Sequence, residues 1–444
     1  MRLRFAPSPT GFLHVGNGRI AIVNALLAIR HGGQLILRLD DTDTERCRPE
    51  FAEAIEEDLR WLGILYEGPI RQRDRTALYE AAAERLKAAG LLYPCFESEE
   101  ELRIKREQRL RQGKPPIYDR AALKMTAEQF ERALANGKRP YWRFKLSGLP
   151  RSWTDAVLGR RTVRTSAVSD PVLIRTDGSF LYTFTSVVDD IEMGITHIVR
   201  GEDHVTNTGV QLDLFAALGG DPEALRFAHL PLLTDADGGP LSKRLGSLSL
   251  RQLRRDGIEA PALVGYLAAL GSARDPIPGM PAELAAGFDL ALVSKSAARF
   301  DPRQLLALNR RVLQTMPYAE AAPRLPEGAT EAFWYAVRGN LDMFSEARRW
   351  WEVVQGRIIP PPLPEEGDFL RIALDCLPPE PFDATTWSVW TEAVKRATGR
   401  KGKALYFPLR LALTGEDHGP DLKELLPLIG RARAVERLRL AAGA

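Results

Sequence analysis

The sequence of 444 residues predicts an α/β fold in its first half and a mostly helical C-terminal part. Two observations predict this division. Within about the first forty residues, a strand-like run, a loop, a helical stretch and a second strand-like run follow one another, which is the order of a βαβ unit. From about residue 250 onward, the apolar residues recur mostly at helical spacing.

The first strand and the first helix are predicted near the N-terminus. Residues 2–5 form a strand-like run, and two prolines with a glycine exclude regular structure in residues 6–11. After Gly16 the apolar residues fall on one helical face as far as Arg30. The pair of glycines at 32–33 is typical of a helix C-terminus.

The second strand of the unit is the apolar run of residues 35–39. A right-handed crossover should bring it parallel to the first strand. Asp40, Asp41 and Asp43 follow it directly. Because parallel sheets bind ligands beyond the carboxyl ends of their strands, polar chemistry is expected there.

The next part of the chain is predicted to be helical and then interrupted by an insertion. Residues 50–90 have helical spacing, whereas residues 91–170 shift in composition and include a basic run at 103–111. This segment is expected to separate two halves of a nucleotide-binding fold. Further along, three prolines at 360–362 divide the helical C-terminal part.

Strand-like segments return after the insertion. We expect strands at 172–174 and 181–184, on either side of a hairpin turn at Asp177-Gly178. Another strand is expected at 196–200, and it ends at a cluster of polar residues.

Composition excludes several classes of protein. Lys and Arg number 61 against 58 Asp and Glu, so the formal charge of +3 excludes a polycation of the histone type but leaves room for local basic patches. Hydrophobic residues make up 45% and charged residues 27%, which is typical of a globular protein and not of a disordered one. The three cysteines lie far apart, so they do not form a disulfide framework and they fit a reducing compartment. With no secretory signal and no apolar run near the ~20 residues of a membrane span, a cytoplasmic location is expected.

Two motifs suit phosphate binding. His14 precedes a predicted helix, whose N-terminal N–H groups and dipole attract anions, and Gly16 allows a ligand to approach the backbone. Lys243 follows a glycine-rich loop, so its charge would engage phosphates when the loop closes. For each motif alone, the alternative is an incidental histidine or a solvated surface lysine.

Five separated motifs occur in one order along the chain. They are PSPTGFLHVGN at 7–17, RLDDTD at 38–43, VVDDIEMGITHIVRGEDH at 187–204, PLSKR at 240–244 and GKALYFPLRLALTG at 402–415. With them the sequence resembles the class I aminoacyl-tRNA synthetases, and its match to the glutamyl-tRNA synthetase family is close. HVGN stands where that family has its HIGH signature, and PLSKR stands where it has KMSKS. The resemblance covers essentially the whole chain.

The resemblance implies a Rossmann-type catalytic domain, split by an inserted domain that binds the tRNA acceptor end, and an all-α C-terminal region that binds the anticodon. We expect the first catalytic half at 1–90, the insertion at 91–170, the second catalytic half at 171–235, the KMSKS loop and stem-contact region at 236–300, and the helical anticodon-binding region at 301–444.

The resemblance also implies the reaction. The carboxylate of L-glutamate attacks the α-phosphorus of ATP, and the terminal adenosine hydroxyl of tRNA then takes the glutamyl group from the adenylate. His14 and Lys243 are the expected catalytic residues, because they would stabilise the α-phosphoryl transition state. Mg²⁺ would travel with the ATP phosphates. The expected partner is tRNA(Glu), with tRNA(Gln) left open as a second acceptor. The protein is expected to be a monomer with no membrane partner.

Site residues carry over from the family motif by motif. ATP binding is expected at Pro7, His14, Gly16, Asn17, Ser242, Lys243 and Arg244. Glutamate binding is expected at Arg4, Ser8, Asp40, Tyr182, Arg200 and His204. Arg4 and Arg200 are the expected carboxylate clamps, because arginine binds carboxylates bidentately, and Asp40 is the expected partner of the ammonium group. A salt bridge at the sheet edge is the alternative for Arg4.

A basic stretch near the C-terminus suits RNA. Arg400, Lys401, Lys403 and Arg410 are expected to contact tRNA, and aromatic residues lie between them. Cations bind phosphates and aromatic rings stack on unpaired bases, which single-stranded loops require. The alternative is a solvated helix end beside core aromatics. The tryptophans of this part of the chain are expected in a helical core.

Three departures from the family pattern stand out. Pro240 replaces the first lysine of KMSKS, so the catalytic weight falls on Lys243. Asp40 stands where many glutamyl enzymes have glutamate. Cys95 lies in a segment that resembles the start of a zinc-binding element in some relatives, but it has no cysteine partners nearby, so we predict no zinc.

Rival functions remain to be separated. Glutaminyl-tRNA synthetases carry C-terminal β-barrels, which the helical periodicity after residue 300 disfavours. A truncated relative that glutamylates a modified tRNA base lacks the C-terminal half. A small-molecule nucleotidylyltransferase would not need the long helical C-terminus. An RNA-binding paralogue with an inactive site would not need the catalytic residues of the motifs, which are intact in this sequence.

Overall fold

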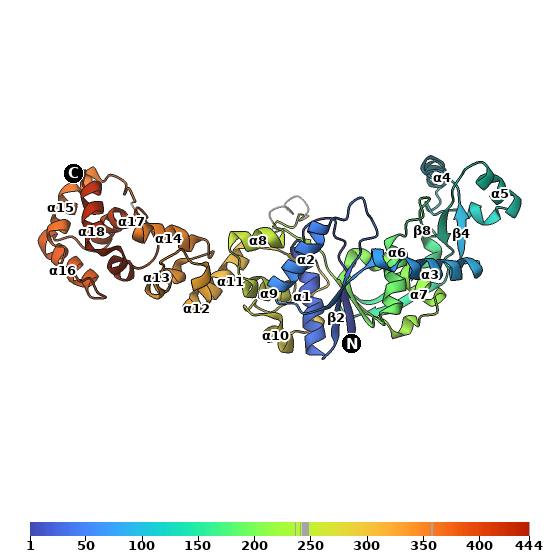
Figure 1. Cartoon of the computed structure of the whole chain (residues 1–444), viewed down its shortest axis with the longest axis horizontal. Coiled ribbons are helices and arrows are strands. Elements are labelled where there is room, and N and C mark those ends of the chain that lie inside the picture. The colour runs from blue at the N-terminus through green and yellow to red at the C-terminus, as the bar shows by residue number, and fades with distance from the viewer. Residues whose placement is uncertain (236, 240, 242–247, 357, 444) are drawn as a thin grey trace. The chain divides into compact units, whose positions relative to one another are not determined.

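The structure is a computed structural model, and it describes the chain except residues 236, 240, 242–247, 357 and 444. The chain divides into two compact units. The N-terminal unit holds residues 1–253 and 264–301, and the C-terminal unit holds residues 254–263 and 302–444. Figure 1 shows that the first unit mixes strands and helices and that the second is helical. This agrees with the predicted fold class.

A seven-stranded sheet forms the centre of the N-terminal unit. Its order is β3 (Glu67–Arg71), β2 (Gln34–Leu39), β1 (Arg2–Phe5), β9 (His197–Gly201), β10 (Arg226–Leu230), β6 (Pro150–Asp155) and β7 (Gly159–Arg164). All neighbours from β3 to β6 pair in parallel, and only β7 runs antiparallel, to β6. The chain proceeds from β1 toward β2 on one side, and β9 lies on the other. The carboxyl ends of β1 and β9 therefore form a topological switch point, where such sheets bind ligands.

The predicted βαβ unit is confirmed. β1 and β2 pair in parallel from Arg2 opposite Gln34 to Phe5 opposite Leu37. Between them α1 (Val15–Arg30) packs on β1, β2 and β9. The helix ends at a left-handed Gly32, as the glycine pair predicts.

The other helices of this unit are α2 (Pro49–Trp61), α3 (Thr76–Ala88), α4 (Glu99–Arg111), α5 (Ala127–Ala135), α6 (Tyr182–Glu192), α7 (Val205–Ala217) and α10 (Pro281–Leu284). α3 contacts α6, and α7 contacts both α6 and the β6–β7 hairpin. A short pair, β11 (Leu233–Thr234) and β12 (Ala298–Arg299), completes the strands. α8 (Leu250–Asp256) and α9 (Ala260–Ala269) span the limits between the two units.

Two segments differ from the sequence prediction. Residues 50–90 contain strand β3 between two helices, and Pro69 lies in it, which an edge strand tolerates because a proline lacks the N–H group. The strand predicted at 181–184 is wrong. The Asp177-Gly178 turn does bring Ile174 opposite Phe180, but α6 begins directly afterwards, with Tyr182 as its first residue.

Residues 92–174 form a small antiparallel sheet and contribute a hairpin to the large one. The small sheet has the order β4 (Leu92–Cys95), β5 (Tyr141–Phe144) and β8 (Val172–Ile174), and Figure 1 shows α4 and α5 at the same end of the unit. The β6–β7 hairpin joins the large sheet instead. The basic run 103–111 lies on α4, where Arg103 pairs with Glu100 and Glu107.

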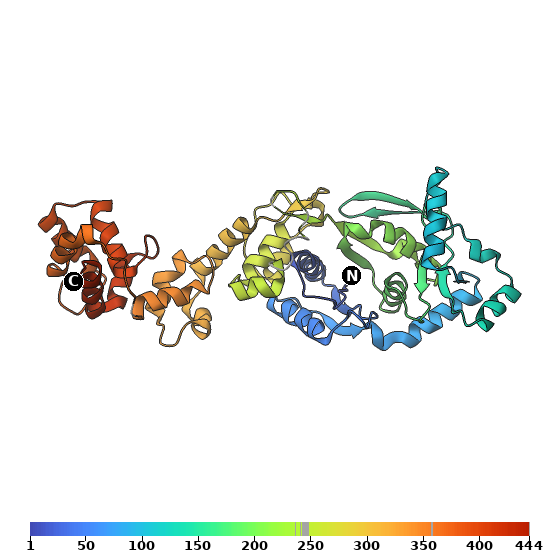
Figure 2. The ribbon, with the colours of Figure 1, turned by 90° about the horizontal axis from the view of Figure 1, so that it is seen from above.

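The C-terminal unit is built from helices around one core. They are α11 (Pro302–Thr315), α12 (Tyr318–Ala321), α13 (Glu331–Val337), α14 (Glu346–Gln355), α15 (Gly367–Asp375), α16 (Thr386–Thr398), α17 (Lys403–Thr414) and α18 (Leu422–Ala441) (Figure 2). The predicted proline break lies between α14 and α15. Of the four tryptophans expected in this core, Trp350 and Trp390 are buried in it, and Trp351 and Trp387 are half-buried and pack against it.

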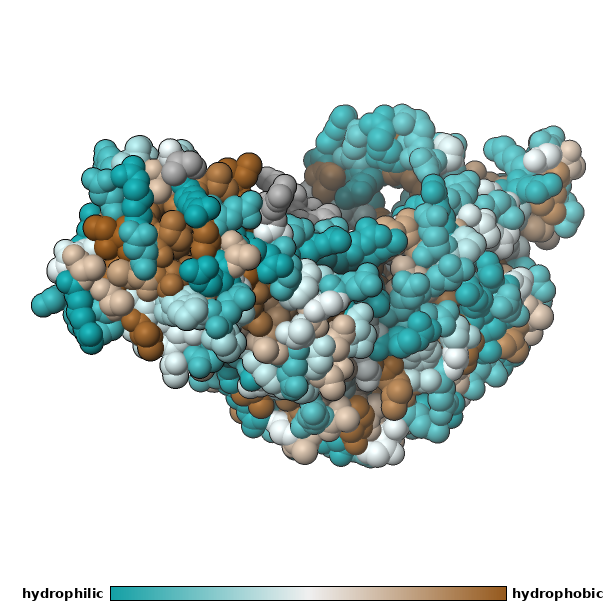
Figure 3. Space-filling view, turned by 60° about the vertical axis from the view of Figure 1, so that its left-hand side comes forward, coloured by the Kyte–Doolittle hydropathy of each residue, from teal (hydrophilic) through white to brown (hydrophobic). Residues whose placement is uncertain are grey.

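No helix in the described part of the chain is long and apolar enough to cross a membrane. The face seen in Figure 3 is mostly hydrophilic, with smaller hydrophobic patches between.

Candidate active site

A cavity of about 390 Å³ opens at the carboxyl ends of β1, β9 and β10. Eight residues predicted from the sequence line it: Arg4, Pro7, His14, Gly16, Asn17, Tyr182, Arg200 and His204. They come from segments up to two hundred residues apart, and the sheet order brings them to the switch point. The cavity therefore joins the expected ATP residues and most of the expected glutamate residues.

His14 caps the N-terminus of α1 on the cavity side. Its Nδ1 accepts a hydrogen bond from the backbone N–H of Gly16 at 3.0 Å, and burial lowers its pKa below the ordinary 6.5. A neutral ring whose Nδ1 accepts must carry its proton on Nε2. Nε2 is thus left as a donor for an anion. A Cβ at Gly16 would lie 2.8 Å from the His14 ring, so this cap requires glycine.

Arg200 is a buried cation whose hydrogen-bond partners among the described residues are all neutral. At the end of β9 its guanidinium donates to the Tyr182 hydroxyl at 3.3 Å and to Thr208 Oγ1 at 2.5 Å. Among the described residues no carboxylate lies within 4.0 Å of it. Burial lowers its pKa. Because a buried charge without a counter-ion is costly, this site suits an anionic ligand.

Arg4 differs from Arg200 because a carboxylate already neutralises it. Its Nε lies 3.2 Å from Asp190 on α6, and both side chains are nearly fully buried. The salt bridge predicted as the alternative for Arg4 is therefore present. It does not lie at the sheet edge, because β1 is a central strand with neighbours on both sides. Arg4 still lines the cavity.

Asp40 and Ser8 do not line the cavity. Asp40 accepts from Arg38 at 2.6 and 3.1 Å, and Arg38 also reaches Asp190 at 2.8 Å. Although burial alone would lower it, these carboxylates raise the pKa of Arg38 above its ordinary value. Ser8 is exposed, and its carbonyl accepts from the N–H of Thr10. Asp40 lies behind the cavity wall, where its backbone N–H donates to the Pro7 carbonyl at 3.0 Å.

The remaining predicted phosphate residues, Ser242, Lys243 and Arg244, lie outside the described residues, as does Pro240. Beyond these residues, Ser249 forms an antiparallel bridge with His14, next to the start of α1.

Arg19 is a cavity residue that sequence reasoning missed. It lies on α1 with 2% of its surface exposed, and it donates to the carbonyls of Pro231 and Leu270 at 2.9 Å each. Burial lowers its pKa to about 10. The sequence could have indicated this residue, because it is a charged residue at a position of the predicted helix that faces the core.

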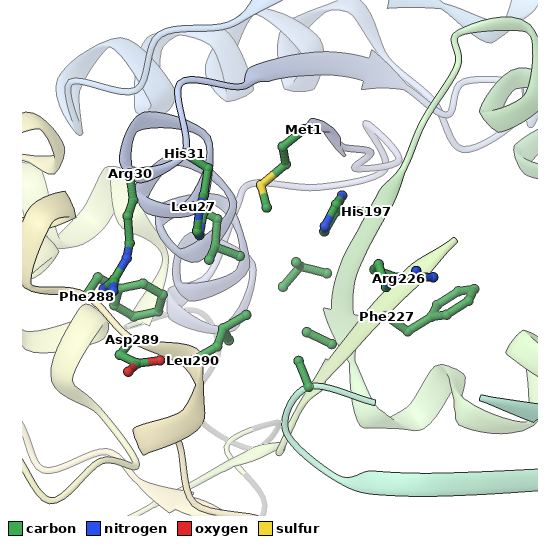
Figure 4. Close-up of a pocket in the computed structure, with 13 residues that line it drawn as sticks. Met1, Leu27, Arg30, His31, His197, Arg226, Phe227, Phe288, Asp289 and Leu290 are labelled. Carbon is green, nitrogen blue, oxygen red and sulfur yellow. The ribbon is translucent and has the colours of Figure 1, made fainter. Parts of the chain in front are cut away.

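A second cavity, of about 220 Å³, lies at the opposite, amino ends of β1, β9 and β10 (Figure 4). Figure 4 shows His31 and Arg30 from the end of α1, with His197 and Arg226 facing from the strands. None of the predicted site residues lines it.

The predicted tRNA residues differ in how they are engaged. Arg400 forms an ion pair with Glu366 and lies 4.3 Å from the centre of the Phe369 ring. Arg410 is half-buried and donates to the Pro420 carbonyl at 3.0 Å. Lys401 and Lys403 are exposed, and no ion pair is present for either among the described residues.

Metal ligands do not cluster in the described residues. No group of three or more His, Cys, Asp or Glu side chains is placed there to hold a metal ion. Cys95 is buried, with its sulfur 3.8 Å from the Tyr118 hydroxyl.

Comparison with known proteins identifies the family. Residues 1–306 match the family described as "tRNA synthetases class I (E and Q), catalytic domain", and residues 365–442 match "Anticodon binding domain". A glutamate–tRNA ligase 2 of Granulibacter bethesdensis is 65% identical over 100% of this chain and 99% of its own length. A glutamate–tRNA ligase 1 of a Chelativorans species is 51% identical over 98% of this chain and 99% of its own.

Solved structures agree with the sequence matches. A glutamate tRNA ligase of Elizabethkingia meningosepticum, in complex with its amino acid, superimposes with a TM-score of 0.85 at 27% identity, over 100% of this chain and 99% of that chain. A glutamate–tRNA synthetase of Elizabethkingia anophelis gives 0.86 at 26% identity, over 100% of both chains. The fold, the cavity at the switch point and these full-length similarities together establish that the chain belongs to the class I tRNA synthetases of the E and Q family.

Proposed function

We propose that the protein is a glutamate–tRNA ligase, which activates L-glutamate with ATP and transfers it to the 3′-terminal adenosine of tRNA(Glu). The observation that carries this proposal is that His14 and Arg200 line the same cavity. One is a neutral N–H donor at a helix N-terminus, suited to a phosphate. The other is a buried arginine with neutral partners, suited to a carboxylate.

In the first step an oxygen of the α-carboxylate of glutamate attacks the α-phosphorus of ATP. A new O–P bond forms, the bond to pyrophosphate breaks, and glutamyl-adenylate remains. His14 donates from Nε2 to the phosphoryl oxygens, and Lys243 adds its charge there. Mg²⁺ arrives with ATP, because hard cations bind phosphate oxygens. No protein nucleophile takes part, so positioning and electrostatics supply the acceleration.

In the second step the terminal adenosine hydroxyl of tRNA attacks the carbonyl carbon of the adenylate, and AMP leaves. We assign acceptor binding to the inserted residues 91–170 and anticodon binding to residues 301–444. Exposed Lys401 and Lys403 support phosphate contact in the second region, whereas Arg400 and Arg410 contribute there by holding neighbouring segments. We further propose a cytoplasmic monomer.

Arg200 provides the test of the carboxylate assignment. In ATP–pyrophosphate exchange with tRNA(Glu) present, Arg200→Met should raise the KM for glutamate by about a hundredfold, because one partner of a buried charge pair is lost. The KM for ATP should change little. Arg226→Met, at the amino end of the neighbouring strand β10, is the matched control and should behave as wild type. Equal glutamate KM values in both variants would refute the assignment.

A further inference from the structure

His229 contacts the cavity residue Arg200 from outside the cavity. This histidine lies on β10, is fully buried and does not line the cavity. Its Nδ1 is 2.5 Å from Oδ2 of Asp155, which ends β6. Its Nε2 is 2.9 Å from Thr208 Oγ1 and 3.4 Å from Nε of Arg200. His229 therefore connects a buried carboxylate to the arginine that faces the cavity.

Asp155 fixes which nitrogen of His229 carries the proton. Its Oδ1 accepts from the backbone N–H groups of Val157, Leu158 and His229, at 3.0, 3.0 and 3.1 Å. Against the effect of burial, the hydrogen bonds from His229 and the backbone lower the pKa of Asp155 to about 2. An ionised carboxylate only accepts, so Nδ1 of His229 must donate. Burial lowers the pKa of His229, and the neutral ring then has its lone pair on Nε2.

That lone pair faces the guanidinium of Arg200. Nε of Arg200 points at His229, and one Nη atom points at Thr208. The ring therefore supplies an acceptor without supplying a negative charge. A carboxylate in its place would neutralise Arg200, as Asp190 does for Arg4. A histidine with the proton on Nε2 would instead place a donor against a cation.

We propose that His229, held as the Nδ1–H tautomer by Asp155, is a positioning residue that orients Arg200 toward the substrate carboxylate while leaving its charge unneutralised. This inference rests on the proposed function. It also assigns a role to the β6–β7 hairpin, because Asp155 brings this inserted element into contact with the glutamate pocket through one hydrogen-bonded chain.

Two substitutions of His229 separate the two hydrogen bonds. His229→Gln keeps an acceptor near the position of Nε2, whereas His229→Asn keeps only a polar group near Nδ1. In ATP–pyrophosphate exchange with tRNA(Glu), His229→Asn should raise the KM for glutamate about tenfold or more, since a hydrogen bond to a charged group is lost. The KM for ATP should stay within about twofold, and His229→Gln should restore most of the glutamate affinity.

A merely structural role predicts something different. Both variants would then lose thermal stability and kcat together, with glutamate and ATP affected alike, and this result would overturn the proposal. Unchanged glutamate KM in a folded His229→Asn variant would overturn it as well. A wild-type protein without glutamate-dependent exchange would refute the proposed function itself, so the two failures are distinguishable.

The tautomer of the His229 ring can be measured without substituting His229 itself. In long-range ¹H–¹⁵N spectra of histidine-labelled wild type near neutral pH, one of the six histidines should be a neutral Nδ1–H tautomer that becomes Nε2–H or mixed in Asp155→Asn. A wild-type spectrum without an Nδ1–H ring would overturn the proposal whether or not the enzyme is active.

Discussion

Buried charges are the feature that most distinguishes the N-terminal unit at the scale of single residues. Arg38 is fully buried on β2 and lies within 3.7 Å of three carboxylates, those of Asp40, Asp189 and Asp190. Asp189 is shared further with Arg75, at 2.8 Å. Such a network holds β1, β2 and α6 in one arrangement, because a shift of Arg38 would weaken the pairing of all three carboxylates.

Removing the central cation should therefore be costly. Arg38→Met takes the ion-pair partner from Asp40 and one of the two partners from Asp189 and Asp190, so it should lower the free energy of unfolding by about 3–5 kcal/mol. Arg103→Met breaks exposed pairs on α4, which water screens, and should cost far less. Urea denaturation of both variants measures the difference. Equal losses would contradict the network.

Three histidines, one buried and two half-buried, make stability depend on pH. Burial lowers the pKa of His14, His204 and His229 in the folded protein, whereas the unfolded chain titrates near 6.5. Below that pH these rings bind more protons in the unfolded state, so their contribution to the free energy of unfolding should fall as the pH drops from about 7 to about 5. Asp40 opposes them in this window, because burial raises its pKa to about 6.

His14→Asn keeps a capping acceptor and removes one titrating ring, so it should flatten this slope. His418→Asn, at an exposed residue, is the control and should leave the slope unchanged. Thermal unfolding across the pH range provides the measurement, and identical slopes in both variants would count against a neutral His14.

At the residue scale the sequence predicted the residues that line the cavity but not the buried residues that hold them in place. His14 and Arg200 lie inside the motifs that carry the family resemblance, and Arg4 carries over from the same family, so the resemblance predicted all three. Arg38 and His229 lie in apolar strand segments, where a polar residue signals a buried partner without saying which. Their partners come from α6 and β6, so only the fold reveals them.

At the scale of elements, α7 and β7 approach so closely that glycine is required. A Cβ on Gly209 of α7 would lie 2.3 Å from Cβ of Val163 on β7. Gly209→Ala should therefore destabilise the protein by about 1–3 kcal/mol, although alanine favours helices. Gly339→Ala, where nothing lies within 4 Å, should not destabilise. Calorimetry of both variants decides, and a stable Gly209→Ala protein would contradict the packing.

The turn between α16 and α17 carries the clearest test of RNA contact. Replacing Lys401 and Lys403 by alanine should lower the salt dependence of tRNA binding by about one to two in log K against log salt, because two phosphate contacts are lost. Lys395→Ala is the control, since that lysine already pairs with Glu392 at 3.0 Å. An unchanged slope in the double variant would remove this turn from the interface.

Elements whose apolar residues recur at a clear helical or strand spacing were predictable. Elements that form because of their contacts with other parts of the fold were not. The β1–α1–β2 unit follows from local pattern alone. The sequence of strand β3 has no alternation of apolar and polar residues that would predict a strand. The strand forms because it pairs with β2. Residues 181–184 favour a strand by composition, yet α6 forms because its buried side, with Phe184 and Val188, packs within the core beneath the sheet.

At the scale of the whole molecule, the family assignment covers both units. The catalytic family match ends at residue 306, and the anticodon-binding match begins at residue 365, within the helical C-terminal unit. The candidate site lies wholly in the N-terminal unit, because every residue lining the cavity belongs to it. We therefore expect glutamate activation to depend on the first unit and the second unit to act through tRNA.

The most direct test of the central claim is aminoacylation with labelled glutamate, using tRNA(Glu) and tRNA(Gln) in parallel and Lys243→Ala as the inactive control. The account predicts charging of tRNA(Glu) by the wild type and a severe loss in the variant, and charging of tRNA(Gln) in the same assay would add a second acceptor. Charging of neither tRNA, or a Lys243→Ala protein as active as wild type, would contradict it.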